Sequence, residues 1–444
     1  MRRIPQRLNM RQHRFFYGWI IVAVSCINLA VIFGLWYSFS VFFVAIIEEF
    51  QWSRAATSGV FSCFIMVHSF SAILVGSALD RFGPRRVIPA AVCLVAAGLV
   101  ASSRIQELWQ LYFWYGMVTA AGVCAVGFIA HSMILPRWFE RKRGLAIGIA
   151  MAGIGIGMQI IVPTSQYLIE LYGWRSAYLI MAVMILVTLL PLNLLLQRSG
   201  PEEIGDVPDG WGSRSIDNVT AATEPESEER INRDTEAGRH PNALTLHDAL
   251  RTRSFWFLAS SFFFTPLAIQ GTLIHQVASV TDKGFPPVQA AFFFGMAGIF
   301  GSAGKIIFGS LSDRIGREPA FALGMSCAAI GVISLFFLQE GRDFLLYTYA
   351  VLFGLGYGSV APVMPARAAD LFLGPHFGKI FGMIAIAGGT GGAFGVLLSG
   401  KIFDITNNYT IAFLVAIVAI ILSIVLFIRA SSAGPGKSPG QTGR

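Results

Sequence analysis

The chain has 444 residues, of which 55% are hydrophobic and only 13% are charged, and its mean hydropathy is +0.63. A soluble protein of this size would need far more polar surface, so the composition excludes a soluble globular domain. The net charge of +8 does not indicate a nucleic-acid partner, because Arg and Lys concentrate in alternate connections between apolar runs. The five cysteines lie inside apolar runs without metal-ligand spacing, and we expect neither a metal site nor a cofactor.

Apolar runs of membrane-spanning length recur along the chain, which predicts an all-α membrane protein with twelve transmembrane helices. An even number of spans places both termini on one side, and the basic N-terminal tail places that side in the cytoplasm. We therefore expect a multi-pass protein of the plasma or inner membrane. The spans are predicted at 17–46, 55–79, 87–103, 109–134, 144–169 and 174–196, and then at 254–281, 288–312, 319–338, 344–371, 378–402 and 410–429.

The spans fall into two groups of six on either side of a polar segment. That segment is rich in Glu, Asp, Arg, Ser, Pro and Gly and nearly free of aromatic residues, so we expect a flexible linker without a fold of its own. Near its end, Thr245 and Asp248 resemble a helix-start capping box. The predicted organisation is a cytoplasmic tail (1–16), an N-terminal six-helix bundle (17–197), a cytoplasmic linker (198–253), a C-terminal six-helix bundle (254–430) and a cytoplasmic C-terminal tail (431–444).

The two groups repeat each other in sequence. The motif GSALDRFG from Gly76 returns as GSLSDRIG from Gly309, and GIAMAG from Gly148 is echoed by GMIAIAG from Gly382. In both motifs, the second copy follows the first at nearly the same distance along the chain. This indicates a duplicated six-helix unit, the arrangement of a transporter with two pseudo-symmetric halves.

The repeated G-x-x-x-D-R-x-G resembles the loop between the second and third helices in each half of the major facilitator superfamily. The carboxylates of Asp80 and Asp313 can face a neighbouring helix N-terminus, where negative charge is favoured. The resemblance implies that Arg81 and Arg314 form ion pairs across a cytoplasmic gate. A basic turn that only sets the topology is the alternative.

A second motif, WFERKRGLAIGIAMAG from Trp138 to Gly153, resembles the fifth-helix signature of the monocarboxylate transporter family. Its small residues allow close helix packing, and Tyr17-Gly18-Trp19 is a looser form of that family's other signature. The lysine that animal members carry in the first helix has no counterpart, since the first lysine is Lys142. The pattern is more similar to the bacterial branch, which includes lactate transporters and the oxalate:formate antiporter.

Lys305 is the one charged residue in the apolar run from Val288 to Leu311. A cation within the membrane is costly and usually marks a pathway or an anion site, although a structural role is the alternative. In the bacterial branch, a Gly-Arg pair stands where this chain has Gly304-Lys305. The resemblance implies that Lys305 takes the place of the carboxylate-binding arginine, as a point charge that can also lose its proton when desolvated.

Further candidates come from the same resemblance and from polar residues within spans. His275 and Asp282 match the branch's His and the Asp seven residues later, and they join Lys305 as candidates for proton coupling. His275 is also a candidate for substrate binding. A helix–helix hydrogen bond for His275 and a place in the outer loop for Asp282 are the alternatives. Tyr357 can present a hydroxyl to a carboxylate, and Asn28 lies on a helix that lines the pore by fold analogy; packing is the alternative for both.

No enzyme signature is recognisable in the sequence. We therefore predict a secondary transporter of small monocarboxylates such as lactate or pyruvate, coupled to a proton and working by alternating access. Its partners would be the organic anion, the proton and the lipid bilayer, with no need for an oligomer. A carboxylate antiporter of the oxalate:formate type is one alternative, favoured by the absence of Asp and Glu deep within the spans. A carboxylate sensor that transports nothing is the other.

Overall fold

The computed structural model describes residues 16–209, 245–374 and 376–432, and every regular element in this part of the chain is helical. In the N-terminal half the first three spans are α1 (Gly18–Phe50), α2 (Arg54–Phe82) and α3 (Pro84–Ser102). The fourth is built from α4 (Leu108–Leu111), η1 (Tyr112–Thr119), α5 (Ala120–Val126) and α6 (Phe128–Trp138), and α7 (Arg143–Leu196) follows.

The C-terminal half repeats this order after a short helix, α10 (Leu246–Leu250). Its spans are α11 (Arg253–Thr281), α12 (Pro287–Ile315), α13 (Arg317–Phe336), the combined α14 (Phe344–Thr348), η3 (Tyr349–Phe353) and α15 (Gly354–Phe372), then α16 (Phe377–Thr406) and α17 (Thr410–Ser432).

Eleven helices of the described chain are long and apolar enough to cross a membrane. One of them, α7, contains a break at Gly173, where φ is 77° and ψ is 158°. Only glycine adopts this backbone conformation readily, so the break separates the fifth span from the sixth. With α7 counted as two spans, the predicted twelve-helix fold is confirmed.

The last glycine of the repeated G-x-x-x-D-R-x-G motif has the same conformation in both halves. Gly83 ends α2 with a φ of 75°, and Gly316 ends α12 with a φ of 95°. A side chain is strained at such angles, so both positions require glycine for the sharp turn into the next span. Pro84 follows directly as the first residue of α3, where its missing N–H is not needed.

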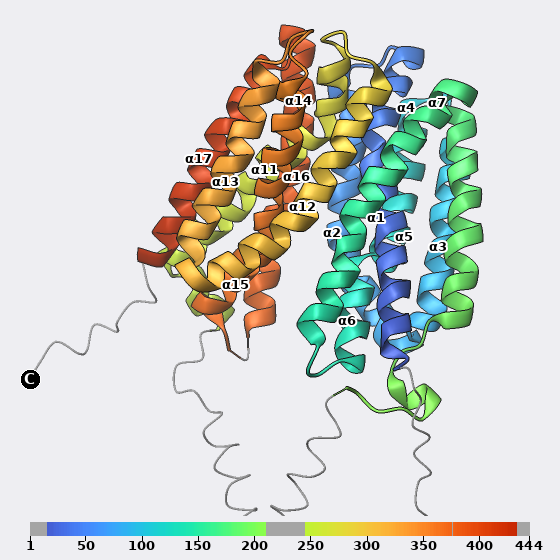
Figure 1. Cartoon of the computed structure of the whole chain (residues 1–444), viewed down its shortest axis with the longest axis vertical. Helices are drawn as coiled ribbons and strands as arrows, with labels where there is room; N and C mark the ends of the chain where they lie inside the picture. Colours follow the sequence, from blue (N-terminus) through green and yellow to red (C-terminus); the bar gives the residue numbers. More distant parts are fainter. Residues whose placement is uncertain (1–15, 210–244, 375, 433–444) are drawn as a thin grey trace, which may run out of the picture.

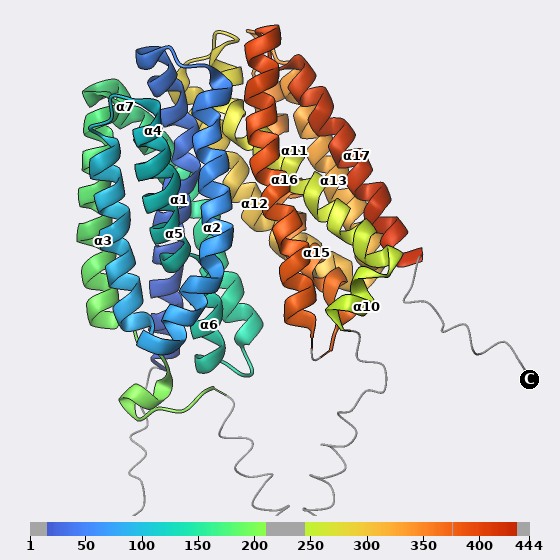
Figure 2. The ribbon, with the colours of Figure 1, turned by 180° about the vertical axis from the view of Figure 1, so that it is seen from behind.

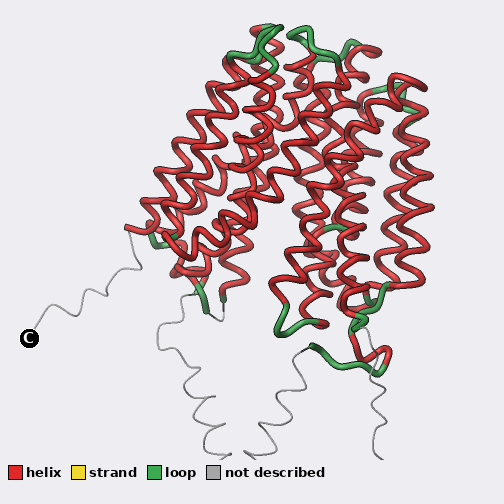
Figure 3. The backbone as a smooth tube through the Cα atoms, viewed as in Figure 1, coloured by secondary structure: helices red, strands yellow, loops and turns green. Residues whose placement is uncertain are grey.

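The two halves stand side by side, with α1–α7 in blue to green and α10–α17 in yellow to red (Figure 1). The view from behind shows the same separation (Figure 2), and the connecting loops gather at the two ends of the helices (Figure 3). We call the upper end, with Arg54 and Asp282, the outer end, and the lower end, with Asp80 and Asp313, the inner end. The names follow the predicted orientation. The helices of the two halves lie together at the outer end and diverge toward the inner end.

Three helix pairs join the halves: α1 with α11, α2 with α16, and α7 with α12. Small residues of the fifth span explain the packing of α7 against α12 and against α1. A Cβ at Gly155 would collide with the backbone oxygen of Gly298 on α12, and a Cβ at Gly153 would collide with that of Cys26 on α1. The fifth span therefore packs with its backbone directly against one helix of each half.

The segment between the halves is described only at its two ends, and 210–244 lie outside the described residues. At its far end the predicted capping box is present: Thr245 Oγ1 accepts a hydrogen bond from the Asp248 N–H, and the Asp248 carboxylate accepts one from the Thr245 N–H. This box starts the short helix α10, and Thr252 then caps α11 separately. The predicted domain boundaries stay predictions.

Candidate functional site

Lys305 lies on α12 and is half-buried. Its ammonium group makes no hydrogen bond or ion pair with any residue of the described chain. It stands ten residues before the helix ends at Ile315, about 15 Å from the inner end at 1.5 Å per residue. Lys305 is therefore a cation well inside the helix bundle without a counter-ion from this part of the chain.

The neighbours of Lys305 on α12 show which way its side chain faces. A Cβ at Gly301, one turn before Lys305, would lie 3.1 Å from Cδ1 of Tyr357 on α15. Ser302 lies 3.5 Å from the Ala152 carbonyl oxygen of α7. At about 100° per residue, Lys305 points between these two directions, about 40° from Gly301. Helical side chains also tilt toward the helix N-terminus, so Lys305 extends toward Gly301 and Tyr357.

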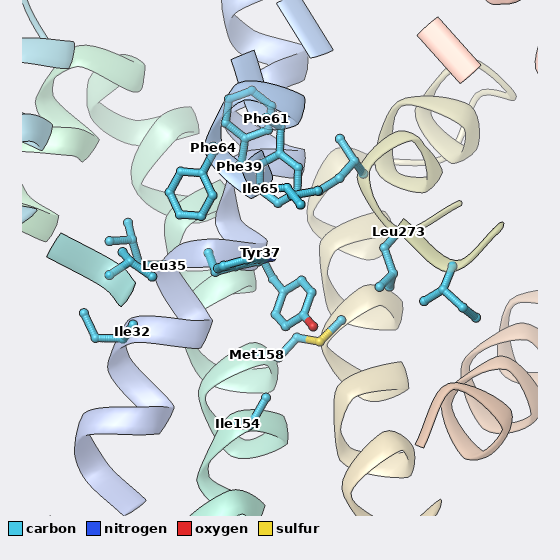
Figure 4. Packing of buried hydrophobic residues seen from close by; sticks show 14 of the residues in the cluster. Ile32, Leu35, Tyr37, Phe39, Phe61, Phe64, Ile65, Ile154, Met158 and Leu273 are labelled. Atoms are coloured by element: carbon cyan, nitrogen blue, oxygen red, sulfur yellow. The ribbon is translucent and has the colours of Figure 1, made fainter. Parts of the chain in front are cut away.

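Tyr357 is joined to the other half by a hydrogen bond. Its hydroxyl oxygen lies 2.5 Å from that of Tyr37 on α1, and either hydroxyl can be the donor. Tyr37 is buried, its ring meets Phe294 of α12 edge-on at 6.0 Å, and its hydroxyl lies beside Met158 (Figure 4). Two hydroxyls from opposite halves thus meet within an apolar and aromatic wall, close to the side of α12 on which Lys305 stands.

A further polar atom faces α12 in the same region. Gln159 on α7 backs onto Gly295 of α12, where a Cβ would lie 2.7 Å from the Gln159 Cα. Its Oε1 is buried and has no hydrogen-bond partner among the described residues. Because Gly295 directly follows the Phe294 that Tyr37 contacts, Gln159 belongs to the wall around Tyr37. Gly295 lies ten residues before Lys305 on α12, about 15 Å along the helix, so Gln159 marks the outer margin of the site. We define the central site as Lys305, Tyr357, Tyr37 and Gln159.

A second polar cluster closes the outer end. The Arg54 guanidinium, at the start of α2, donates to both oxygens of Asp282 at 2.7 and 2.8 Å and to the Tyr409 hydroxyl at 2.8 Å. Asp404 of α16 accepts hydrogen bonds from the backbone N–H groups of Arg54 and Ala55. Both carboxylates belong to the C-terminal half, so Arg54 and Asp282 form an ion pair that ties the halves together.

His275 belongs to the outer cluster rather than to the central site. Its Nε2 lies 2.9 Å from the Val396 carbonyl oxygen, which can only accept, so Nε2 carries the proton. Nδ1 must then accept from the Tyr409 hydroxyl, 3.0 Å away. His275 is fully buried and both ring nitrogens are engaged. This is a helix–helix hydrogen-bond arrangement, and a role for His275 in substrate binding or coupling stays a prediction.

The four predicted gate residues lie at the inner end and are exposed: Asp80, Arg81, Asp313 and Arg314. Asp313 pairs with Arg317 one turn away, and Arg317 also contacts Asp370. Arg367 pairs with Glu318, again within the C-terminal half. Among the described residues, no ion pair connects the two halves at this end. The structure therefore has its outer end tied and its inner end untied, and the inner gate stays a prediction.

Asn28 is placed away from the central site. Its side-chain amide and that of Asn193 on α7 donate to each other, at 2.9 and 2.8 Å, and both residues are fully buried. This reciprocal pair joins the first and sixth spans. The amide of Asn28 is engaged with Asn193, and a role for Asn28 in substrate binding stays a prediction.

The sequence did not single out Tyr37, Arg54 or Tyr409 as site residues. Tyr37 lies with Ser38 and Ser40 in a stretch of the first span that has no charged residue, and its hydroxyl was the available signal. Arg54 was visible only as an isolated basic residue in an outer connection. Their partners are 320 and 228 residues away in the chain, so no local pattern indicates these contacts.

Comparison with known proteins agrees with this architecture. The sequence matches the family described as Major Facilitator Superfamily over residues 25–359 and 304–444. Monocarboxylate transporter 13 of Bos taurus is 30% identical over 404 residues, which cover 90% of this chain and 86% of that protein. Monocarboxylate transporter 2 of Homo sapiens is 25% identical over 396 residues, covering 88% of this chain and 81% of that protein.

A solved structure shares the fold. It is that of a bacterial homolog to the human lysosomal transporter Spinster in an inward-facing and unoccupied conformation, with a TM-score of 0.69 and 14% sequence identity. The alignment covers 96% of this chain and 99% of that one. The helical architecture, the duplicated motif and these similarities agree. The chain is a multi-pass membrane protein that belongs to the Major Facilitator Superfamily, a family of transporters rather than enzymes, and within it is related to the monocarboxylate transporters.

Proposed function

We propose that the chain is a secondary transporter of small monocarboxylates such as lactate or pyruvate, moved together with a proton by alternating access. The observation that carries this proposal is Lys305, a half-buried cation that has no counter-ion among the described residues. An isolated charge at this depth is costly, and a substrate carboxylate would compensate it. The kinship with monocarboxylate transporters supports a small organic anion as the substrate.

The expected interaction free energies assign different roles to the site residues. A carboxylate 4 Å from an ammonium gains about 4 kcal/mol at an effective dielectric constant of 20. A hydrogen bond from a hydroxyl to a charged group contributes less, about 1.5–3 kcal/mol net. Lys305 would therefore provide the affinity for the anion, and the hydroxyls of Tyr357 and Tyr37 would orient it. Phe294 and Met158 would face the apolar end of a short carboxylic acid.

The proton is proposed to act at the outer end. Asp282 is held by Arg54 through two hydrogen bonds, and this ion pair crosses from one half to the other. Protonation of Asp282 would remove its charge and weaken the contact, so that a proton from outside favours opening of that end. Closure of the inner end by the Asp80-Arg81 and Asp313-Arg314 loops would complete the cycle. His275, hydrogen-bonded to Tyr409 in the same cluster, could pass the proton on or only support Tyr409.

The proposed orientation in the membrane and the proposed monomeric state are inferred as follows. With both termini in the cytoplasm, the basic connections lie inside, as in proteins of a plasma or inner membrane. One chain supplies both halves of the central site, so no oligomer is required. We also propose that the chain is related to the bacterial branch of the monocarboxylate transporters, with its lactate transporters and oxalate:formate antiporter, because its His275, Asp282 and Gly304-Lys305 pattern resembles that branch.

Antiport is the second candidate. No Asp or Glu lies deep within the predicted spans, and the central site therefore lacks a buried carboxylate as proton carrier.

Transport assays in proteoliposomes distinguish symport from antiport. A symporter accumulates labelled lactate when the outside is acidified, with empty vesicles. An antiporter ignores the pH gradient and requires unlabelled carboxylate inside. A protein that binds lactate but moves none under either condition would be a sensor, and the proposal would be wrong.

A further inference from the structure

The loop between the fourth and fifth spans carries an unusual contact. Three consecutive backbone N–H groups, those of Glu140, Arg141 and Lys142, all donate to the carboxylate of Asp209. The distances are 2.6 and 3.0 Å to Oδ1 and 3.1 Å to Oδ2. The backbone N–H of Asp209 in turn donates to the Trp138 carbonyl oxygen at 3.3 Å. Successive N–H groups that converge in this way form a cradle for an anion.

The carboxylate is recognised by the backbone and not by the basic side chains nearby. Arg141, Lys142 and Arg143 are exposed, and none of them forms an ion pair with Asp209 in the described part of the chain. The contact therefore depends on the conformation of 139–142 and on a carboxylate at position 209. A polybasic loop that merely attracted acidic residues would not need that geometry.

The path of the chain explains how Asp209 reaches this loop. After α7 ends at Leu196, a one-turn helix, η2 (Pro201–Ile204), is followed by Gly205 with a φ of 70°. The Asp206 N–H closes the turn on the Pro201 carbonyl oxygen at 3.0 Å. The chain then returns along a cavity of about 750 Å³ whose walls include Phe16, Trp19 and Phe139. The first residues after the sixth span are thus packed against the inner end of the first and fifth spans.

This contact lies at the start of α7, which packs against α12 close to Lys305. The residue before α7, Lys142, provides no side-chain cap for that helix. Further along α7, Gly155 packs on Gly298 and Ala152 approaches Ser302, three residues from Lys305. The inner end of α7 must approach α12 when the inner side closes. A contact that holds the inner end of α7 in place would therefore affect closure of the inner side and not binding of the anion.

We propose that the loop 139–142 is a docking surface for an acidic side chain, that Asp209 is its occupant, and that this contact positions the inner end of α7 for the transport cycle. Asp209 is a positioning residue, and its effect on transport rests on the proposed function. The docking itself does not, because it can be measured without any substrate.

Amide hydrogen exchange on the full-length protein in nanodiscs tests the docking. Asp209→Ala removes both acceptor oxygens and with them all three hydrogen bonds, so exchange at the amides of Glu140, Arg141 and Lys142 should rise about tenfold or more, as expected for charge-assisted hydrogen bonds. Asp209→Asn keeps one acceptor oxygen but turns an NH₂ toward the third amide, so the rise should concentrate on Lys142. Asp206→Ala is the matched control, because within the described part of the chain the Asp206 carboxylate accepts a hydrogen bond only from its neighbour, the Val207 N–H.

Lactate transport tests the positioning role. Asp209→Ala should lower turnover severalfold while leaving KM unchanged, because the anion site is intact. Asp206→Ala should change neither value. Unchanged protection in Asp209→Ala, or an equal loss in Asp206→Ala, would overturn the docking. Lost protection with normal turnover would overturn the positioning role. If wild-type protein moved no carboxylate at all, the proposed function would fail while the exchange result still decided the docking.

Discussion

The hydroxyls of Tyr37 and Tyr357 lie 2.5 Å apart and connect the two halves of the molecule beside Gly301. Each tyrosine belongs to a helix of a different half, so a ligand that binds one hydroxyl competes with the contact between the halves. This arrangement relates occupancy of the central site to the relative position of the halves. A static receptor would have no need for it.

Tyr357→Phe is expected to weaken lactate binding by about 1.5–3 kcal/mol, the range for a hydrogen bond to a charged group. Tyr37→Phe leaves the Tyr357 hydroxyl free for substrate, and a smaller loss or none is expected. Titration calorimetry on both variants and on the double variant measures this order. Equal losses for the two single variants would show that Tyr37 contacts the substrate as directly as Tyr357.

The ion pair between Arg54 and Asp282 predicts a shift in the population of conformations. Asp282→Asn should weaken the outer contact by about 1 kcal/mol, a modest value because Asp282 is partly exposed. The outward-open fraction would then rise about fivefold, using 1.4 kcal/mol per factor of ten. Distances between spin labels at positions 48 and 407, one on each half at the outer end, report the change.

Arg175→Ala is the control for this experiment. Arg175 and Glu49 also form an ion pair at the outer end, but both belong to the N-terminal half. Removing this pair should leave the distance distribution as in the wild type. An equal shift in Arg175→Ala would mean that general loosening, and not the contact between the halves, is measured.

Proton coupling is expected to depend on Asp282 more than on His275. If Asp282 carries the coupled proton, its neutral form no longer attracts Arg54, so acidification outside should accelerate uptake. Asp282→Asn mimics the protonated state, and uptake by this variant should no longer respond to a pH gradient while exchange of lactate continues. Normal pH dependence in Asp282→Asn and its loss in His275→Gln would assign the proton to His275 instead.

The fifth span contains glycines with opposite expected effects. A Cβ at Gly155 would collide with the backbone of Gly298, whereas a Cβ at Gly148 meets nothing within 4 Å. Gly155→Ala should destabilise the protein by about 1–3 kcal/mol as the packed helices separate. Gly148→Ala should be neutral or stabilise it by up to about 1 kcal/mol, because alanine favours a helix. Thermal unfolding in detergent compares the two variants directly.

The fold was predictable from sequence because each span is a local signal of length and hydropathy. The duplicated motif indicated that the fold has two pseudo-symmetric halves. The final glycine of each copy, Gly83 and Gly316, has a positive φ in the structure. Gly173 also has a positive φ and divides α7 into the fifth and sixth spans, which the sequence predicted as separate helices. These features depend on residues close together in the chain.

The central site was predictable only in part. Lys305 is conspicuous because a cation in an apolar run has no local explanation, and Tyr357 was a candidate through its hydroxyl. The partner Tyr37, the ion-pair partner Arg54 and the docking of Asp209 depend on contacts between residues far apart in the chain. The engagement of Asn28 with Asn193 and of His275 with Tyr409 is likewise a tertiary fact.

The central claim is that Lys305 binds the substrate carboxylate, and lactate binding to three lysine variants tests it most directly. Calorimetry should show binding lost in Lys305→Ala, retained in Lys305→Arg, and unchanged in Lys379→Ala, which removes an exposed lysine at the inner end of α16. If Lys305→Arg also alters the pH dependence of binding, the lysine takes part in proton coupling. Lactate binding to Lys305→Ala with the affinity of the wild type would contradict the account.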